Sequence, residues 1–226
     1  MTYKTVALLP MKANSERVVG KNFKHFAGKP LFKWVLEALL AVDEIEKVII
    51  NTDARHILAD NGLVETDRII IRDRPIEIQG DFVSMNRVIE DDILNVDATS
   101  YLMTHTTNPN ISANTFRQAV LEYEKGLTKG FDSLFSVTKQ QTRFYREDGS
   151  AVNHDPNVLL RTQDLEPWFE ENSCLYVFSK KAFEQTNARI GKKPMLFETP
   201  RFESIDIDDA QSWELAELVK KSLLNN

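Results

Sequence analysis

The stretch LLPMKANSERVVGKNFKHFAGKPL, residues 8–31, begins as a buried strand would and then turns basic. Six Lys or Arg and one Glu lie between residues 12 and 33, in a chain whose formal net charge is −6. Backbone N–H groups and cations gathered in this way are what a polyphosphate needs. Neither G-x-G-x-x-G nor a P-loop is present, because Gly28-Lys29-Pro30 lacks the first Gly and the final Ser or Thr. On charge alone, the segment is either a solvated basic turn or a phosphate-binding loop.

The composition limits the class of protein. The chain has 226 residues, of which 42% are hydrophobic, as in an ordinary globular protein. Its net negative charge argues against a general nucleic-acid binder. No apolar run approaches the ~20 residues that a membrane helix needs, and the N-terminus has no signal-peptide pattern. The single cysteine, Cys174, excludes an internal disulfide. We therefore expect a cytoplasmic protein with no nucleic-acid or membrane partner.

Short apolar runs alternate with amphipathic helical patterns along the chain. Strands are expected at residues 5–9, 47–52, 68–72, 101–104, 133–137, 174–178 and 203–207, and helices at 30–42, 54–62, 84–96, 113–126, from 180, and at 209–223. Gly126 is expected to end the fourth helix. This order predicts one domain, residues 1–226, with a mixed, mostly parallel sheet in a three-layer α/β/α fold. Ligands bind beyond the carboxyl ends of such strands, which is where the basic segment begins.

Residues 139–172 break the pattern. They alternate weakly, contain Asp148-Gly149 as a hairpin signal and have no clear amphipathic helix. We interpret them as a projecting hairpin arm. The arm carries the apolar side chains of Phe144, Tyr145, Val158, Leu159, Leu160, Leu165, Trp168 and Phe169. Left in water, these would form a larger patch than monomers usually tolerate, so we expect a homodimer joined through the arm. The alternative is an arm folded back on its own domain.

Five blocks in order carry a family resemblance. They are LLPMKANSERVVGKN…GKPL, VIINTD, RPIEIQGD, ENSCLYVF and SIDIDDAQSWELAE, spread over residues 8–217. Together they resemble the acylneuraminate cytidylyltransferases, or CMP–sugar synthetases. The resemblance implies a nucleotidyltransferase fold, a homodimer and a Mg²⁺-dependent reaction of CTP with an acidic sugar to give CMP–sugar and pyrophosphate.

The resemblance also implies roles for residues. Lys12, Arg17 and Lys21 would hold the triphosphate, and Arg74 would contact the cytosine. The residues implied for the nucleotide are Leu9, Pro10, Lys12, Ser15, Arg17, Lys21, Asn22, Arg74 and Ser84. Those implied for the sugar are Thr104, Arg161 and Tyr176. Local alternatives exist: Arg74 as a surface arginine, Ser84 as a helix cap and Tyr176 as a core residue.

This chain departs from the family pattern at several positions. Lys12 replaces the usual Arg, which keeps the charge but loses bidentate geometry. Asn14 and Glu16 make the loop less glycine-rich. Thr104 and His105 stand where the family often has Gln-Pro, and that Gln usually helps to bind the substrates. The acceptor is therefore open among a nine-carbon sialic-type acid, a bacterial deoxy analogue and an eight-carbon ulosonate.

Asp206 and Asp208 lie two residues apart on a predicted strand, so their side chains would share one face. Two carboxylates at a strand end, with substrate phosphates, suit Mg²⁺. The resemblance assigns this pair to the metal and places Asp208, as a catalytic residue, near the attacking hydroxyl. Alternatively, Asp208 caps the last helix with Gln211, and Asp209 could do the same.

Two other functions fit part of the pattern. A glycosyltransferase of related fold would use a nucleotide sugar as donor, but it usually carries D-x-D after a middle strand, whereas IDID lies near the C-terminus here. A catalytically inactive nucleotide-binding protein would explain the missing Gln.

Overall fold

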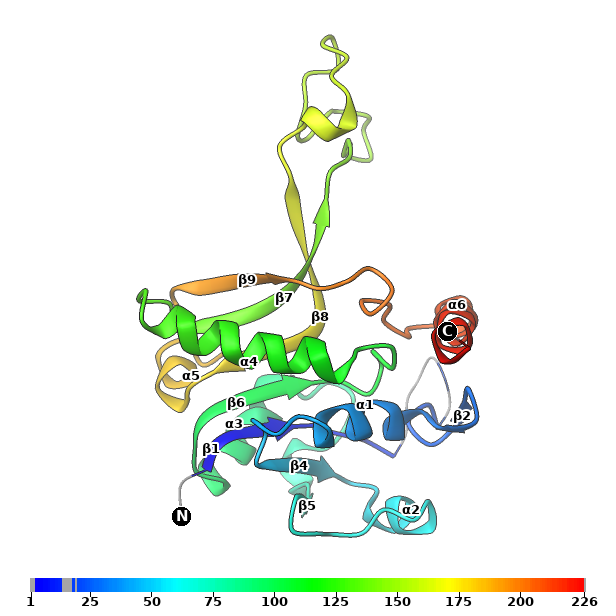
Figure 1. Ribbon diagram of the computed structural model, residues 1–226, viewed down its shortest axis with the longest axis vertical. Helices are drawn as coiled ribbons and strands as arrows, with labels where there is room; N and C mark the ends of the chain where they lie inside the picture. Colours follow the sequence, from blue (N-terminus) through cyan, green and yellow to red (C-terminus); the bar gives the residue numbers. More distant parts are fainter. Residues whose placement is uncertain (1–2, 14–17, 19, 226) are drawn as a thin grey trace.

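A seven-stranded mixed sheet forms the centre of the computed structural model, which describes residues 3–13, 18 and 20–225 (Figure 1). The strand order is β5-β4-β1-β6-β8-β7-β9. The bounds are β1 Tyr3–Leu8, β4 Lys47–Thr52, β5 Ile69–Asp73, β6 Ala98–Thr104, β7 Ser133–Gln140, β8 Trp168–Phe178 and β9 Pro194–Glu198. Strands β5, β4, β1 and β6 run parallel, β8 runs antiparallel to β6 and β7, and β9 is parallel to β7. The mostly parallel, mixed sheet predicted from the sequence is confirmed.

Helices cover both faces of this sheet. Helices α1 (Leu31–Leu40) and α4 (Ala113–Leu127) pack on one face, and α3 (Met85–Asn95) and α5 (Lys180–Thr186) pack on the other. Strand alternation divides the core, because Ala7 faces the first pair while Val6 and Leu8 face the second. Short helices α2 (Arg55–Asp60) and η1 (Ile76–Ile78) flank β5 in sequence. Within the described residues, no helix is long and apolar enough to cross a bilayer.

The basic segment folds into a small hairpin against the C-terminal helix. Strands β2 (His25–Phe26) and β3 (Lys29–Pro30) are joined by Ala27 and Gly28, with φ of 46° and 99°. Positive φ at both loop residues is what a two-residue hairpin turn requires. Helix α6 (Ala210–Leu224) packs here through Trp213, whose ring centroid lies 5.3 Å from that of Phe26. The chain before α6 is thereby brought beside the basic segment.

Two local predictions are wrong. Residues 203–207 are irregular, and the seventh strand is β9, nearer the N-terminus. Pro194 hid this strand in the sequence, yet a proline is tolerated as the first residue of an edge strand. Gly126 does not end α4 but lies in its last turn, where a Cβ would stand 3.1 Å from Met195 Cε. This glycine therefore permits close packing against β9.

The arm leaves the sheet where β7 and β8 continue past its edge as a two-stranded ribbon (Figure 1). The hairpin predicted at Asp148-Gly149 is present, since Ser150 N donates to Asp148 Oδ1 at 2.9 Å and Gly149 has φ of 81°. Helix η2 (Thr162–Asp164) follows on the return path. Most apolar side chains of the arm are exposed, and Leu159 most of all, at 90%.

Candidate active site

A cavity of about 280 Å³ lies at the carboxyl ends of β1, β5 and β6. Its lining residues are Pro10, Lys12, Lys21, Asn22, Arg74, Asp81, Met85, His105, Thr106, Thr107 and Asp208. The chain topology predicts a ligand site at this edge. Of the predicted site residues, Ser15 and Arg17 lie outside the described residues.

The loop after β1 brings two cations to the cavity. Lys12 forms an ion pair with Asp81, and Lys21 Nζ donates to the Ile207 carbonyl at 2.5 Å. Asn22 holds the loop, because its Nδ2 donates to the Lys12 carbonyl at 2.9 Å and its Oδ1 accepts from Thr106 at 2.6 Å. Lys12 and Lys21 thus stand where phosphates could meet them.

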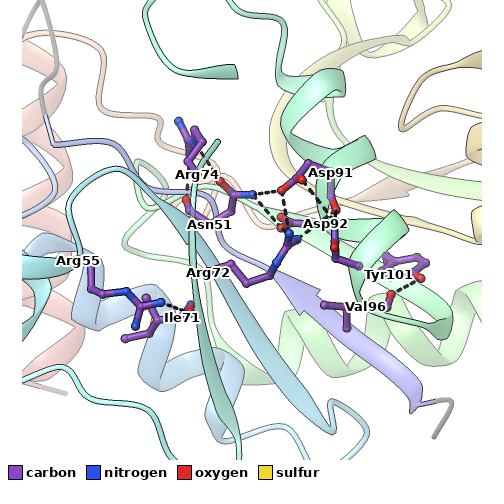
Figure 2. A network of polar contacts seen from close by, with 10 residues as sticks. Asn51, Arg55, Ile71, Arg72, Arg74, Asp91, Asp92, Val96 and Tyr101 are labelled. Atoms are coloured by element: carbon purple, nitrogen blue, oxygen red, sulfur yellow. Dashed lines mark hydrogen bonds and ion pairs between the residues drawn. The ribbon is translucent and has the colours of Figure 1, made fainter. Parts of the chain in front are cut away.

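Arg74 ends a buried polar network, here called the Arg74 network: Asn51, Arg72, Arg74, Asp91 and Asp92 (Figure 2). Arg74 Nε donates to Asn51 Oδ1 at 2.8 Å, and Nη2 donates to the Asn51 carbonyl at 2.9 Å. Asn51 Nδ2 donates to Asp91 at 3.0 Å and to Asp92 at 2.9 Å. Arg72 pairs with both carboxylates, at 3.0 and 2.7 Å. Because arginine only donates, the Asn51 amide must turn its oxygen to Arg74. The orientation of the Arg74 guanidinium is therefore fixed by its hydrogen bonds to Asn51.

Burial shifts the titration of the groups around the cavity. It raises the pKa of Asp92 to about 7, against the hydrogen bond from Asn51 and the charge of Arg72. Burial also lowers the pKa of Arg74, while the charges of the nearby carboxylates act in the opposite direction. Burial, with the charges of Arg189 and Lys21, lowers the pKa of His105 to about 3. His105 is thus neutral at pH 7, which argues against a role as a general acid.

Asp206 and Asp208 lie on an irregular segment, not on a strand face; Asp208 lines the cavity, and Asp206 lies two positions before it. Ile207 N donates to the Thr107 carbonyl at 2.9 Å, and Lys21 binds the Ile207 carbonyl, so the segment is held from both sides. Asp209 caps α6, accepting from Ser212 N at 2.8 Å. The capping alternative therefore belongs to Asp209, and Asp208 lines the cavity.

Asp206 has two features expected of a carboxylate that binds a metal ion: an oxygen without a protein partner and a raised pKa. Among the described residues, its Oδ1 is buried without a hydrogen-bond partner. Burial raises the pKa of Asp206; the Asp208 charge raises it further, while Thr107 and Lys21 oppose the shift. Two carboxylates close enough to raise a pKa would be relieved by a cation between them.

Several predicted residues do not line the cavity. The Leu9 side chain is in the core, and Ser84 caps α3, accepting from Asn86 N at 3.3 Å. Thr104 is fully buried, and its hydroxyl donates to the Cys174 carbonyl at 2.6 Å. On the arm, Arg161 pairs with Asp164 at 2.7 Å. The Tyr176 ring is buried, and its hydroxyl donates to Glu171.

His105, rather than Thr104, lies at the cavity, and the sequence held a signal for this. When the last proline of the family segment L-Q-P-T-S-P is aligned with Pro109 of this chain, the Gln of the segment aligns with His105. The shift by one residue moves the side chain to the other side of the strand. Asn51 was also missed, although a polar residue within the apolar run VIINT indicates a buried hydrogen bond.

Lys12 and Lys21 from the loop after β1, the buried Arg74 and the carboxylates of Asp81 and Asp208 line one cavity at the carboxyl edge of the sheet. This arrangement in an α/β protein suits a nucleotide held through its phosphates. A family model described as Cytidylyltransferase matches residues 6–214, and the chain belongs to this family. The family expected from the sequence blocks is confirmed.

Curated relatives span nearly the whole chain. Pseudaminic acid cytidylyltransferase of Campylobacter jejuni is 24% identical, over 96% of this chain and 97% of its own. CMP-N,N'-diacetyllegionaminic acid synthase of Legionella pneumophila is 27% identical, over 94% of each. N-acylneuraminate cytidylyltransferase of Escherichia coli is 25% identical, over 96% of this chain and 52% of its own.

Solved structures share the fold. CMP:2-keto-3-deoxy-manno-octonic acid synthetase complexed with CTP has a TM-score of 0.67, with 14% identity over 97% of this chain and 99% of its own. 4-Diphosphocytidyl-2C-methyl-D-erythritol synthase from Anaerococcus prevotii has a TM-score of 0.65, with 13% identity over 97% and 96%. The predicted nucleotidyltransferase fold is confirmed.

Proposed function

We propose that this protein transfers the cytidylyl group of CTP to a hydroxyl of an acidic sugar of the ulosonic type, with release of pyrophosphate. The observation that carries the proposal is one cavity that joins Lys12 and Lys21 to Asp208, two positions from Asp206, whose Oδ1 is buried. The family and the relatives' names support CTP and a sugar acid as substrates. With a single cysteine, the chain suits the reducing cytoplasm, where we place the reaction.

The chemistry is an in-line displacement at the α-phosphorus. The sugar oxygen forms a bond to this phosphorus while the bond to the β-phosphate oxygen breaks, and pyrophosphate leaves. Lys12 and Lys21 neutralise the charge on the leaving phosphates; the family pattern assigns Arg17 to the same task and Ser15 to nucleotide binding. Arg74 meets the cytosine. Asp208 accepts the proton of the attacking hydroxyl. Catalysis then comes mainly from positioning and charge neutralisation.

The residues at this site fit Mg²⁺. Asp206 supplies a buried carboxylate oxygen without a protein partner, and Asp208 adds a second carboxylate. In the described part of the chain, no group of three or more His, Cys, Asp or Glu could hold a metal. Substrate phosphates and water would complete the oxygen ligands that Mg²⁺ prefers. When bound, the ion supplies charge neutralisation at the reacting phosphate.

A direct assay tests the proposal. The protein is incubated with CTP, Mg²⁺ and, in turn, a nine-carbon sialic-type acid, its bacterial deoxy analogues and an eight-carbon ulosonate, while pyrophosphate is followed. We expect release that depends on one of the acids and on CTP in preference to ATP, GTP and UTP. Absence of release with every acid, or equal use of the four triphosphates, contradicts it.

The arm suggests a homodimer. Val158, Leu159 and Leu160 are 51%, 90% and 46% exposed, and the ring of Phe144 stacks on Trp168 at 5.5 Å. A two-fold contact would cover this surface in both copies and bring Arg161 to the neighbouring site. Sedimentation at micromolar concentration should give the mass of a dimer. Deletion of residues 146–157 should shift it toward the monomer; unchanged mass and activity would make the arm a surface loop.

A further inference from the structure

The site has a second end, on the β6–β8 side of the sheet. The strand order places Arg74 after β5, the basic loop after β1 and His105 after β6, with β8 beside β6. A nucleotide with its base at Arg74 and its phosphates along the basic loop extends toward β6. In the proposed function the acceptor sugar would then lie over the carboxyl end of β6, where Thr104 pairs with Leu175 in the middle of the antiparallel β8.

A cation stands at this end, in a group here called the Arg189 cluster: His105, Glu171, Tyr176 and Arg189. Arg189 lies between α5 and β9, and its Cζ is 3.9 Å from the Tyr176 ring centroid. Its Nη1 is 3.4 Å from His105 Nε2, which must accept because arginine only donates. Stacking on an aromatic face fixes the plane of a guanidinium and leaves its edge for a planar anion. Arg189 is thus oriented before a ligand arrives.

The protein contacts of this guanidinium are long. Its Nη2 is 3.7 Å from Glu171 Oε1, and the Glu171 side chain is 43% exposed. The Arg189 side chain is itself 21% exposed. His105 adds no competing charge, since burial lowers its pKa to about 3. A carboxylate from the substrate would find a partly buried cation whose existing ion pair is loose.

A register shift between β7 and β8 brings residues of the Arg189 cluster together. The β7–β8 register shifts between the pairs Phe135–Tyr176 and Val137–Glu171. Within this shift, Ser173 has φ of 58°, a left-handed conformation that non-glycine residues rarely adopt. The irregularity puts Glu171 against the Tyr176 hydroxyl, although the two are five positions apart. Bulges and strained residues of this kind concentrate at ligand sites.

We propose that Arg189 binds the carboxylate of the acidic sugar, supported by the Tyr176 ring, and that Glu171 is the anion that the substrate displaces. The proposal rests on the proposed function and names the residue that selects an acid over a neutral sugar. It assigns this role to the chain's own Arg189 instead of Arg161, which lies on the arm.

The test compares an acid with its ester. The substrates are the ulosonic acid that gives the highest turnover in the panel above and its C1 methyl ester. Arg189→Gln should lower kcat/KM for the acid about 10- to 100-fold and remove the preference over the ester, with KM for CTP unchanged. Arg189→Lys should retain part of the preference. Glu171→Gln should raise kcat/KM for the acid. Arg117→Gln on α4, which breaks an ion pair with Glu44, is the matched control and should change nothing.

Calorimetric titration of each acid of the panel into the CMP-loaded protein separates the two proposals. If the wild type binds the acid and Arg189→Gln does not, the carboxylate site stands even when turnover fails. If the wild type turns the acid over and Arg189→Gln keeps the acid-to-ester ratio, the site is wrong and the function stands. If the wild type neither binds nor converts any acid of the panel, both proposals are overturned.

Discussion

The two ends of the site differ in how their arginines are held. Arg74 is 7% exposed, and its bonds to Asn51 are 2.8 and 2.9 Å long. Arg189 is held by contacts of 3.4 to 3.9 Å, with a side chain 21% exposed. The nucleotide end is therefore part of the core, whereas the sugar end lies on its margin.

The difference has an energetic meaning. A buried polar network is costly to leave unsatisfied, so every member of the Arg74 network constrains the others. A substitution there changes stability and nucleotide binding together. The loose Arg189 cluster can be altered with little effect on the fold. Under the proposed function, nucleotide choice would then depend on the core, while sugar choice would depend on few residues.

The largest effect should come from the carboxylates between the two ends. We expect Asp206→Asn and Asp208→Asn each to lower turnover by about three orders of magnitude or more, since a metal at a reacting phosphate contributes several kcal/mol. Steady-state rates at millimolar Mg²⁺ measure this, and circular dichroism checks the fold. An Asp206→Asn protein that is unstable but active would show that the pair is structural.

The second-largest effect should come from a substitution within the Arg74 network. Asn51→Leu keeps the approximate side-chain volume but leaves Arg74 and Asp92 without their shared partner. We expect a loss of about 3–5 kcal/mol in unfolding free energy, together with a raised KM for CTP. Asn114→Leu, exposed on α4, is the control and should stay within about 0.5 kcal/mol. A stability loss without any change in KM for CTP would separate the network from nucleotide binding.

A smaller effect is expected at Lys21. Lys21→Ala should weaken CTP binding by about 1.5–3 kcal/mol, the range of a charge-assisted contact, and CMP binding by less. Titration calorimetry with both nucleotides measures the two losses, with Lys33→Ala as control. Equal losses would indicate that Lys21 acts by holding Ile207 rather than by meeting the distal phosphates.

The smallest effect is a pH dependence from Asp92. Its pKa rises from 3.8 to about 7, so the folded protein keeps a proton that the unfolded chain releases. The stabilisation from that proton is full below about pH 4 and is lost as pH rises through about 7. Between pH 5 and pH 8 the wild type should lose more unfolding free energy than Asp92→Asn, as measured with urea. The reverse slope would show that Arg72 keeps the carboxylate ionised.

Much of this arrangement could be predicted from the sequence. Apolar runs with clear periods located the parallel strands, and topology then placed the basic segment with Lys12 and Lys21 at the carboxyl edge, while the family resemblance singled out Arg74. The β9 strand was missed because Pro194 and a short run give little signal. Thr104 was chosen over His105 because a strand's sidedness depends on a one-residue register.

The side-chain contacts that could not be predicted from the sequence join residues that lie far apart along the chain. Asn51 meets Asp91 and Asp92 across about 40 positions, and no local pattern encodes such a contact. Arg189 reaches His105 across 84 positions. Polar networks of this kind are set by tertiary packing, so their members look like ordinary surface or strand residues until the fold brings them together.

Transfer of the cytidylyl group is tested most directly by following the label of CTP. With CTP labelled at the α-phosphorus, Mg²⁺ and the preferred sugar acid, we predict that the label enters a product containing both CMP and the sugar. With CTP labelled at the γ-phosphorus, it should leave as pyrophosphate. Label that stays in CTP with every acid, or that appears as free CMP without a sugar product, would contradict cytidylyl transfer.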